Sequence, residues 1–247
     1  MNAAAALISA SVVIAVPAAG DDGPVVTGNI VVSKSSPELA IKVAEDIPYL
    51  GRHSIRIRDV AAGERLVFAD VDGVQVKRMV ILQFEGFLPS VPEATYRYNF
   101  DGRPIVAGYP FRSNPFSFDL PKARAENPGS ESADTAAFLE SKGIEPPNTW
   151  MMWRSLTAEL PERRDELIIF YVENGDPAGV KISQIYDPET DQSTAFWRGF
   201  MVGLERRANA AFRVAVPRAG AQESSFNWQS VPHVLSGNSN QALSATK

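Results

Sequence analysis

The feature that most constrains the fold is an Asp-Gly pair placed between two runs of β-prone residues. Leu66–Ala69 precedes Asp72-Gly73, and Val74–Phe84 follows it. An Asp-Gly pair in this position favours a type I′ hairpin turn. The second run is half polar at its start and apolar on both faces near Val80, as in a strand buried on both sides. We therefore predict an antiparallel hairpin whose second arm, Val74–Phe84, is a central strand of a sheet.

Other strands follow from alternation or from short apolar runs bounded by turn residues. The run Leu167–Val172 is apolar on both faces and is bounded by Glu166 and Glu173, which predicts a second central strand. Further predicted strands are Ser54–Arg58, Thr95–Phe100 and Phe212–Val216, with short edge strands at Val25-Val26 and Ile30–Val32.

Three helices are predicted from capping residues and apolar spacing. They cover residues 130–142, 148–161 and 191–210; the second has an apolar stripe of Met152, Trp153, Leu156 and Leu160. Strands come first and helices later, without the regular alternation of a parallel sheet. We therefore predict an α+β fold with a mainly antiparallel sheet and about three helices packed on it.

Composition changes along the chain divide it into four parts. Residues 1–20 are mostly small and apolar and end in small residues that are typical of a signal-peptide cleavage site. They predict a signal peptide, although the positively charged residues that usually begin one are missing. Residues 21–50 are expected to be an extended segment, 51–217 a single globular domain, and 218–247 a disordered tail. We expect a periplasmic or secreted protein without a membrane span in the mature chain, or a cytoplasmic one if residues 1–20 are not a signal peptide.

Several kinds of site are excluded or disfavoured by composition. The chain has no cysteine and two histidines, His53 and His233, which excludes thiol catalysis and leaves few ligands for zinc. His233 falls in the predicted tail, and Arg52 disfavours a protonated His53, so neither is expected to act as a catalytic base. The net charge of −5 argues against a nucleic-acid partner. We expect no cofactor.

A metal site is also not expected. The segment from Asp187 to Asp191 places three carboxylates at alternate positions, which suits calcium. However, Gln192 and Arg198 occupy the positions where the calcium loop of an EF-hand needs glycine and glutamate. We interpret the segment as a turn in which Asp191 caps the following helix.

Two carboxylates suggest a catalytic alternative. Glu85 and Glu173 each end an apolar strand and are followed by glycine within two residues. If the two strands ran in the same direction, both side chains would lie at one rim of the sheet and could divide the roles of general acid and general base. Antiparallel strands would instead place them at opposite ends.

The densest aromatic stretch gives the candidate binding residues. Seven Phe and Tyr residues lie between positions 94 and 118, with three arginines interspersed among them. Such a segment can cap the sheet, or it can line a site for an apolar or anionic small molecule or for a protein partner. The candidate ligand-binding residues are Tyr96, Arg97, Tyr98, Tyr109 and Arg112.

These observations favour an exported, non-catalytic binding domain for a small ligand or a protein partner. Two alternatives remain open. One is a cofactor-free hydrolase that uses paired carboxylates, and the other is an envelope interaction protein that engages a partner through Phe226 and Trp228 in the tail.

Overall fold

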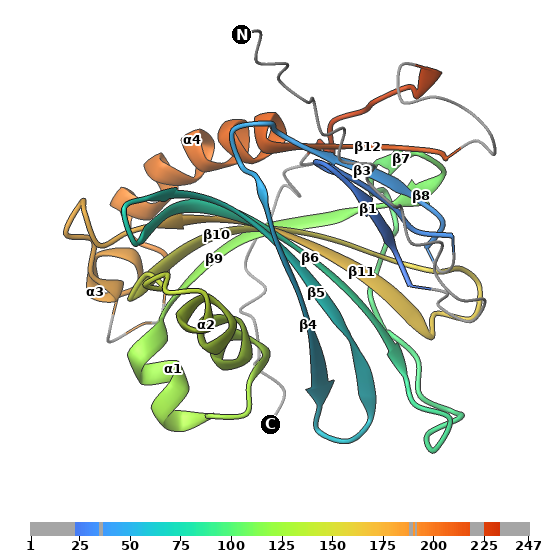
Figure 1. The fold of residues 1–247 in the computed structure, drawn as a ribbon, viewed down its shortest axis with the longest axis horizontal. Helices are drawn as coiled ribbons and strands as arrows, with labels where there is room; N and C mark the ends of the chain where they lie inside the picture. Colours follow the sequence, from blue (N-terminus) through green and yellow to red (C-terminus); the bar gives the residue numbers. More distant parts are fainter. Residues whose placement is uncertain (1–22, 35–36, 188–189, 191, 218–224, 233–247) are drawn as a thin grey trace, which may run out of the picture.

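The centre of the fold is a six-stranded antiparallel sheet (Figure 1). The computed structural model describes residues 23–34, 37–187, 190, 192–217 and 225–232. The strand order is β4-β5-β6-β11-β10-β9, with bounds Tyr49–Ile57, Ala61–Asp72, Gln75–Phe87, Asp165–Asn174, Thr149–Ala158 and Arg112–Asp119. The predicted α+β class with mostly sheet is confirmed. β6 contains the run Val74–Phe84 except for Val74, which lies in the turn, and it lies between β5 and β11.

The predicted hairpin is confirmed, but its turn is of another type. β5 and β6 pair antiparallel from Ala61↔Phe87 to Asp72↔Gln75, so the two loop residues are Gly73 and Val74. Gly73 has a positive φ of 61°, whereas Val74 does not. A type I′ turn needs positive φ at both central residues, so glycine at the first position alone defines a different turn.

The two faces of the large sheet are covered by different layers. α1 (Leu120–Glu126) and α2 (Glu131–Ser141) lie on one face (Figure 1). The other face carries α4 (Ala195–Ala211) and a four-stranded sheet in the order β1-β2-β3-β12. The strands of that sheet are Val25–Thr27, Ile30–Val32, Ala40–Val43 and Phe212–Ala215. The short elements α3 (Ile182–Ile185), β7 (Ile105–Val106) and β8 (Tyr109–Pro110) complete the fold.

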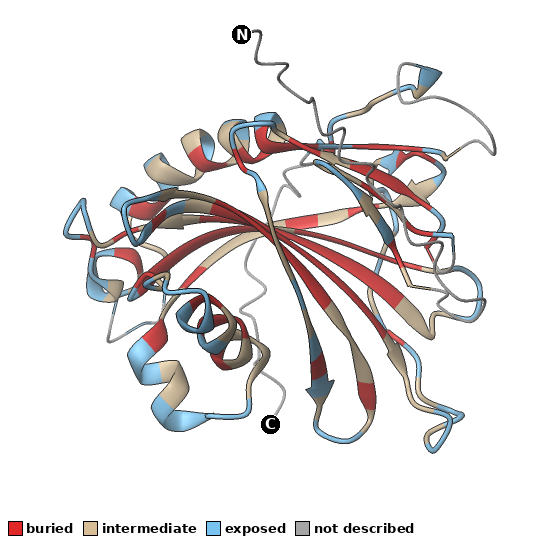
Figure 2. Cartoon of the chain, viewed as in Figure 1, coloured by how far each residue is buried: buried red, intermediate tan, exposed pale blue. Residues whose placement is uncertain are grey.

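Side chains of the central strands alternate between two hydrophobic cores, one on each face of the sheet. In Figure 2 the middle part of these strands is coloured as buried. In β11, Ile168 and Phe170 enter the core beneath α1 and α2, whereas Ile169 and Tyr171 enter the core beneath α4. Strands buried on both faces need apolar residues at consecutive positions, which explains the continuous runs in the sequence.

The same rule explains the one helix that was predicted wrongly. Residues 149–158 form β10 instead of the predicted helix over 148–161. Its apolar residues Met152 and Leu156 face one core and Trp153 faces the other. A strand buried on both sides satisfies this pattern as well as a helical stripe does, and pairing with β9 and β11 decides between them.

Other predicted elements are confirmed in part. α2 begins after Ser130, whose Oγ accepts a hydrogen bond from the Ala133 amide. α4 begins after Thr194, which caps the helix where Asp191 was expected to; Asp191 lies outside the described residues. The predicted strand Thr95–Phe100 is wrong, because these residues form an irregular segment.

The N-terminal segment forms part of the core, so the expected beginning of the globular domain at residue 51 is not a structural boundary. Strand β3 pairs with β12 from the far end of the chain, and Val31, Ile41 and Ile47 are fully buried. Of the expected tail, residues 225–232 are described, and Val231 is buried in the same core. The predicted signal peptide lies outside the described residues. Within the described chain, no helix is both long and apolar enough to span a membrane.

Candidate functional site

Two glutamates face each other on the face of the sheet that carries α1 and α2. Glu85 in β6 and Glu166 in β11 are direct cross-strand partners. Glu85 is 8% exposed and Glu166 is 2% exposed. Burial raises the pKa of Glu166, and the adjacent carboxyl group of Glu85 raises it further. Two carboxyl groups this close in a desolvated environment cannot both ionise without a large cost, so the pair holds a proton.

The predicted pairing of Glu85 with Glu173 is not what the structure shows. β6 and β11 run antiparallel, and Glu173 lies opposite Arg78, at the other end of β11 from Glu166. The two glutamates of β11 are seven positions apart, which corresponds to about 23 Å along a strand. Glu173 accepts hydrogen bonds from Tyr171 (2.7 Å) and, on both oxygens, from Arg207 of α4 (2.5 and 2.9 Å). Its contacts therefore hold α4 against the sheet.

Two of the predicted binding residues do meet the glutamate pair. Tyr96 and Tyr98 lie in the irregular residues 88–104, here called the 88–104 segment, which connects β6 to β7. The Tyr96 hydroxyl donates to Glu85 Oε1 at 2.8 Å, and the Tyr98 hydroxyl lies 3.5 Å from Glu166 Oε1. The two rings are parallel, with centroids 6.1 Å apart. Burial, together with the nearby carboxylates, raises the pKa of both phenols, so the hydroxyls stay protonated as donors.

The other three predicted binding residues lie elsewhere. Arg97 is exposed on the 88–104 segment. Tyr109 packs against the core on the opposite face of the sheet, where its hydroxyl accepts a hydrogen bond from the Glu38 amide at 3.0 Å. Arg112 lies at the start of the edge strand β9, close enough to Arg154 to disfavour the latter's charge. The five predicted binding residues therefore do not form a single surface.

The surroundings of the two glutamates are asymmetric. Glu85 accepts hydrogen bonds from the Tyr96 hydroxyl and from the side-chain amide of Gln83. Glu166 Oε2 is buried and has no hydrogen-bond partner. Burial is the main cause that raises the pKa of Glu166, to about 9, and the hydrogen bond and charge of Glu85 add to it. The shared proton therefore resides on Glu166 at neutral pH.

A buried hydrogen-bond network leads from this pair to α2. Arg65 in β5 is 6% exposed, and its Nε donates to Gln83 Oε1 at 2.6 Å. Its NH1 donates to the Thr135 hydroxyl (2.8 Å) and to the Glu131 carbonyl (2.6 Å). Thr135 Oγ1 also lies 3.2 Å from His53 Nε2. The network fixes the orientation of Gln83, and through it the carboxylate of Glu85.

An open groove of about 690 Å³ lies between α2 and the strands β4 and β5. It is lined by His53, Ser54, Ile55, Arg56, Ala62, Gly63, Asp134, Ala137 and Phe138. His53 stacks on Phe138 at 5.2 Å, and burial lowers its pKa, so its imidazole is neutral at pH 7. His53 therefore belongs to the groove wall. It lies within β4, which begins before the predicted strand Ser54–Arg58.

One row of cross-strand partners in the large sheet includes two residues of the groove and both glutamates. Ile55, Gly63, Glu85 and Glu166 are successive cross-strand partners across four strands. A Cβ at Gly63 would lie 2.0 Å from the Phe84 carbonyl oxygen, so only glycine fits here. The space of that Cβ is taken by the Phe84 carbonyl oxygen and by Cα and Cβ of Glu85, so β5 and β6 pack closely at this point.

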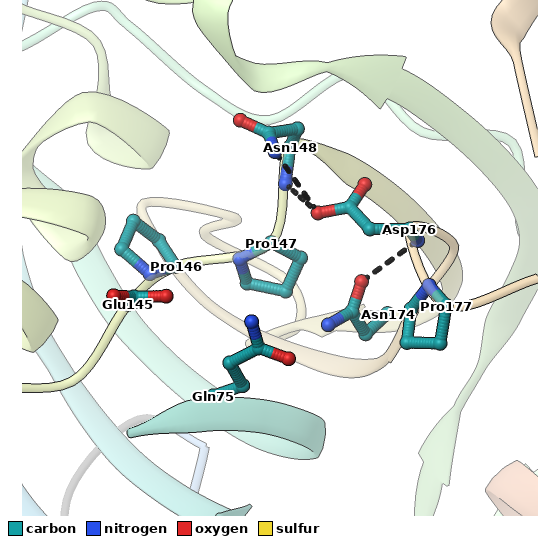
Figure 3. A pocket seen from close by; sticks show the side chains of 8 residues that line it. All are labelled: Gln75, Glu145, Pro146, Pro147, Asn148, Asn174, Asp176 and Pro177. Carbon is teal, nitrogen blue, oxygen red and sulfur yellow. Dashed lines mark hydrogen bonds between the residues drawn. The ribbon is translucent and has the colours of Figure 1, made fainter. Parts of the chain in front are cut away.

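A second cavity, of about 300 Å³, lies where the loops after α2 and β11 meet the start of β6 (Figure 3). Its polar groups are largely used by the loops themselves. Asp176 accepts hydrogen bonds from the backbone and side-chain amides of Asn148 and from the Thr149 amide, and the Asp176 amide donates to Asn174 (Figure 3). We therefore interpret this cavity as a consequence of loop closure.

No group of three or more potential metal ligands is present among the residues that the structure describes. In the segment considered for calcium, Asp187 Oδ1 accepts a hydrogen bond from the Thr190 amide at 3.0 Å. The other two carboxylates of that segment lie outside the described residues.

Sequence reasoning missed Arg65, Gln83 and Glu166 as parts of the site. Each is a polar residue next to or within an apolar strand, which is a usable signal, because a polar side chain at a core position needs a partner. The partner itself depends on strand register. No family model, curated protein or solved structure matches this chain, so its function is inferred from the geometry of the site.

Proposed function

We propose that the protein binds a small, mainly apolar molecule in the groove between α2, β4 and β5. The observation that carries this proposal is the groove of about 690 Å³, whose lining combines apolar side chains with His53, Arg56 and Asp134. Ligand sites are typically concave, between about 300 and 1,000 Å³, mostly apolar, and provided with a few converging polar groups. The groove has an apolar wall of Ile55, Ala137 and Phe138, and its charged or polar lining residues include His53, Arg56 and Asp134.

The site differs from the one that the sequence suggested. The aromatic residues Tyr96 and Tyr98 contact the glutamate pair, whereas the groove is formed by α2 and the strands β4 and β5. We keep the proposal of export, which is supported by the apolar composition of residues 1–20. A role for Phe226 and Trp228 in partner binding likewise remains a proposal.

The test uses N-phenyl-1-naphthylamine, a neutral apolar dye whose fluorescence rises in an apolar site. Ala137 is exposed on the groove wall, so Ala137→Phe fills the groove without removing a core contact. Ala125→Phe makes the same change at an exposed position of α1 and is the matched control. We expect wild type and Ala125→Phe to bind the dye alike and Ala137→Phe to bind at least about tenfold more weakly. Equal binding by both variants would refute the groove as the site.

A second function is favoured by the asymmetry of the glutamate pair. A protonated Glu166 beside a Glu85 that accepts hydrogen bonds is the arrangement in which one carboxyl acts as general acid and the other as general base. This supports a cofactor-free hydrolase with Glu166 in place of Glu173. We expect any hydrolysis of p-nitrophenyl esters or glycosides to be lost in Glu85→Gln and Glu166→Gln and retained in Glu173→Gln. Activity that survives in the first two variants would exclude this mechanism.

A further inference from the structure

We propose that residues 95–104 form a pH-sensitive flap, which covers the Glu85–Glu166 pair while the pair holds its proton and opens once that proton is lost. The flap is the second part of the 88–104 segment. This inference is independent of the groove, because none of residues 95–104 lines it.

The first observation is that the flap lies against the sheet without joining it. Residues 95–104 belong to no helix or strand. Tyr96 is buried and Tyr98 packs against the core, whereas Arg97 between them is exposed. A segment outside the strand ladder opens at a lower cost in free energy than the strands beneath it.

The second observation is that the flap is anchored at both ends. Arg164 donates to the Ala94 carbonyl at 3.0 Å, just before the flap begins. At the other end, the Pro104 carbonyl accepts a hydrogen bond from the Phe111 amide at 2.9 Å. The residues between these anchors can therefore leave the sheet without displacing the chain on either side.

The contacts of the flap converge on the glutamate pair. The Tyr96 hydroxyl donates to Glu85 Oε1 at 2.8 Å, and the Tyr98 hydroxyl lies 3.5 Å from Glu166 Oε1. Glu166 Oε2 is buried without a hydrogen-bond partner. The two tyrosines therefore hold the flap on a pair that has few donors to stabilise a second negative charge.

The nearby cations do not supply those donors. The titratable and charged groups that face the pair are Arg65 of β5, Arg154 of β10 and, from the flap, Tyr96 and Tyr98. Arg65 donates to Gln83 and Thr135, and Arg154 donates to Asn114. Two ionised carboxylates at this place would need water, and the flap is the part of their cover that lies outside the helices and strands.

Loss of the proton therefore favours the open flap. Burial and the adjacent Glu85 raise the pKa of Glu166 from 4.5 to about 9 in the closed protein. A hydrated Glu166 in the open protein would ionise near the ordinary value, so opening releases a proton. The equilibrium constant for opening then rises up to about tenfold per pH unit between about pH 4.5 and 9, and it is constant below that range.

Limited digestion with trypsin measures this opening, because cleavage inside a folded protein follows the population of the open form. Arg97 is the cleavage site in the flap, and cleavage after Arg154 in β10 reports unfolding of the sheet. Initial rates on the full chain are measured by mass spectrometry from pH 7 to 9 and divided by the rate for a short reference peptide. We expect cleavage after Arg97 to rise about ten- to fiftyfold in wild type, without a parallel rise after Arg154.

Two variants test whether the titrating group is Glu166. Glu166→Gln has a neutral side chain of the same shape, so its cleavage after Arg97 should change by less than about threefold over this range. Glu162→Gln is the matched control, because it removes an exposed carboxylate of the loop between β10 and β11, and it should keep the wild-type rise.

Tyr96→Phe provides a second test if Glu166→Gln does not fold. It lacks the hydroxyl that holds the flap on Glu85, so at pH 7 it should be cleaved after Arg97 at least about fivefold faster than wild type. Each of four results would overturn the proposal: a flat wild-type profile, an equal rise after Arg154, a full rise in Glu166→Gln, or wild-type cleavage of Tyr96→Phe.

Discussion

The Glu85–Glu166 pair shows how far the surroundings of a residue control its chemistry. Both glutamates lie on the same face of adjacent strands and are buried to a similar degree. Glu85 accepts two hydrogen bonds from donors at its own end of the sheet, whereas Glu166 has an oxygen with no partner. Because desolvation penalises the charged form, the glutamate with fewer donors retains the proton.

This arrangement predicts a specific pH dependence of stability. The pKa of Glu166 is raised from 4.5 to about 9 by folding, so the folded state holds a proton that the unfolded state releases. The contribution of Glu166 to the free energy of unfolding is therefore largest below about pH 4.5, and it declines as the pH rises towards 9. Glu166→Gln keeps a neutral side chain at every pH. In urea unfolding from pH 5 to 9, the variant should gain up to about 1.4 kcal/mol relative to wild type for each pH unit. A difference that does not change with pH would show that Glu166 is ionised in the folded protein.

The two tyrosines differ in how much their hydroxyls contribute. Tyr96 donates a short hydrogen bond to a buried carboxylate, whereas the Tyr98 hydroxyl lies at the limit of hydrogen-bond distance from Glu166. Tyr96→Phe should lower the free energy of unfolding by about 1.5–3 kcal/mol, and Tyr98→Phe by less than about 1 kcal/mol. Chemical denaturation of both variants at pH 7 measures the difference. Equal losses would mean that the hydrogen bond to Glu85 adds nothing beyond ring packing.

At the scale of elements, the 88–104 segment is held in place by the loop between β10 and β11. Arg164 donates to the carbonyl oxygens of Phe87, Leu88, Val91, Pro92 and Ala94, at distances between 2.5 and 3.2 Å. Arg163 donates to the Tyr98 carbonyl and lies over the ring of Phe100. An irregular segment has no strand partners for its carbonyl groups, so these two arginines satisfy them and position Tyr96 and Tyr98 over the glutamates.

Removing Arg164 should loosen this segment while leaving the sheet intact. In Arg164→Ala, hydrogen exchange of the Val91 and Ala94 amides should accelerate by about tenfold or more, because the turns that they close lose their support. Arg164→Lys should restore little of the protection, since an ammonium group cannot reproduce the planar fork of a guanidinium. Arg97→Ala is the control, because Arg97 is exposed on the same segment. Unchanged exchange in Arg164→Ala would show that the segment is held by its ring contacts.

At the scale of the whole molecule, the beginning and the end of the described chain complete one core. Strand β3 pairs with β12, and Val214 of β12 also forms an antiparallel bridge with Gln229. Residues 23–50 contribute Val31, Leu39 and Ile41, all fully buried, to the core that also holds Trp153 and Trp197. The large sheet would otherwise expose this apolar face to water.

A chain that begins at residue 51 is therefore expected to remain unfolded, because it lacks β1, β2 and β3 and keeps only α4 and β12 over that face of the large sheet. A milder test is Ile41→Ala, which should lower the free energy of unfolding by about 2–5 kcal/mol by leaving a cavity. Ile105→Ala is the matched control, since Ile105 is 73% exposed, and it should change stability by less than about 0.5 kcal/mol. Circular dichroism with urea titration measures both. A shortened chain that folds cooperatively would show that residues 23–50 are an accessory layer.

Local sequence patterns correctly predicted those helices and strands that depend on interactions between neighbouring residues. The hairpin at Asp72-Gly73, the strand of Leu167–Val172 and the helix after Ser130 follow from turn chemistry, apolar runs and capping, which act between neighbours in the chain. Residues 149–158 could not be assigned this way, because an apolar run suits both a buried helix and a strand buried on two sides.

The composition of the site could not be predicted from residues that are close together in the sequence. Tyr96 and Tyr98 stood out as aromatics and Glu85 as a strand-end carboxylate, but their shared partner, Glu166, became visible only with the antiparallel register of β6 and β11. Reversing the direction of one strand moves its terminal carboxylate to the other end of the sheet. The sequence by itself determined which residues were available for a site, and strand direction and register, which are set by long-range packing, decided which of them met.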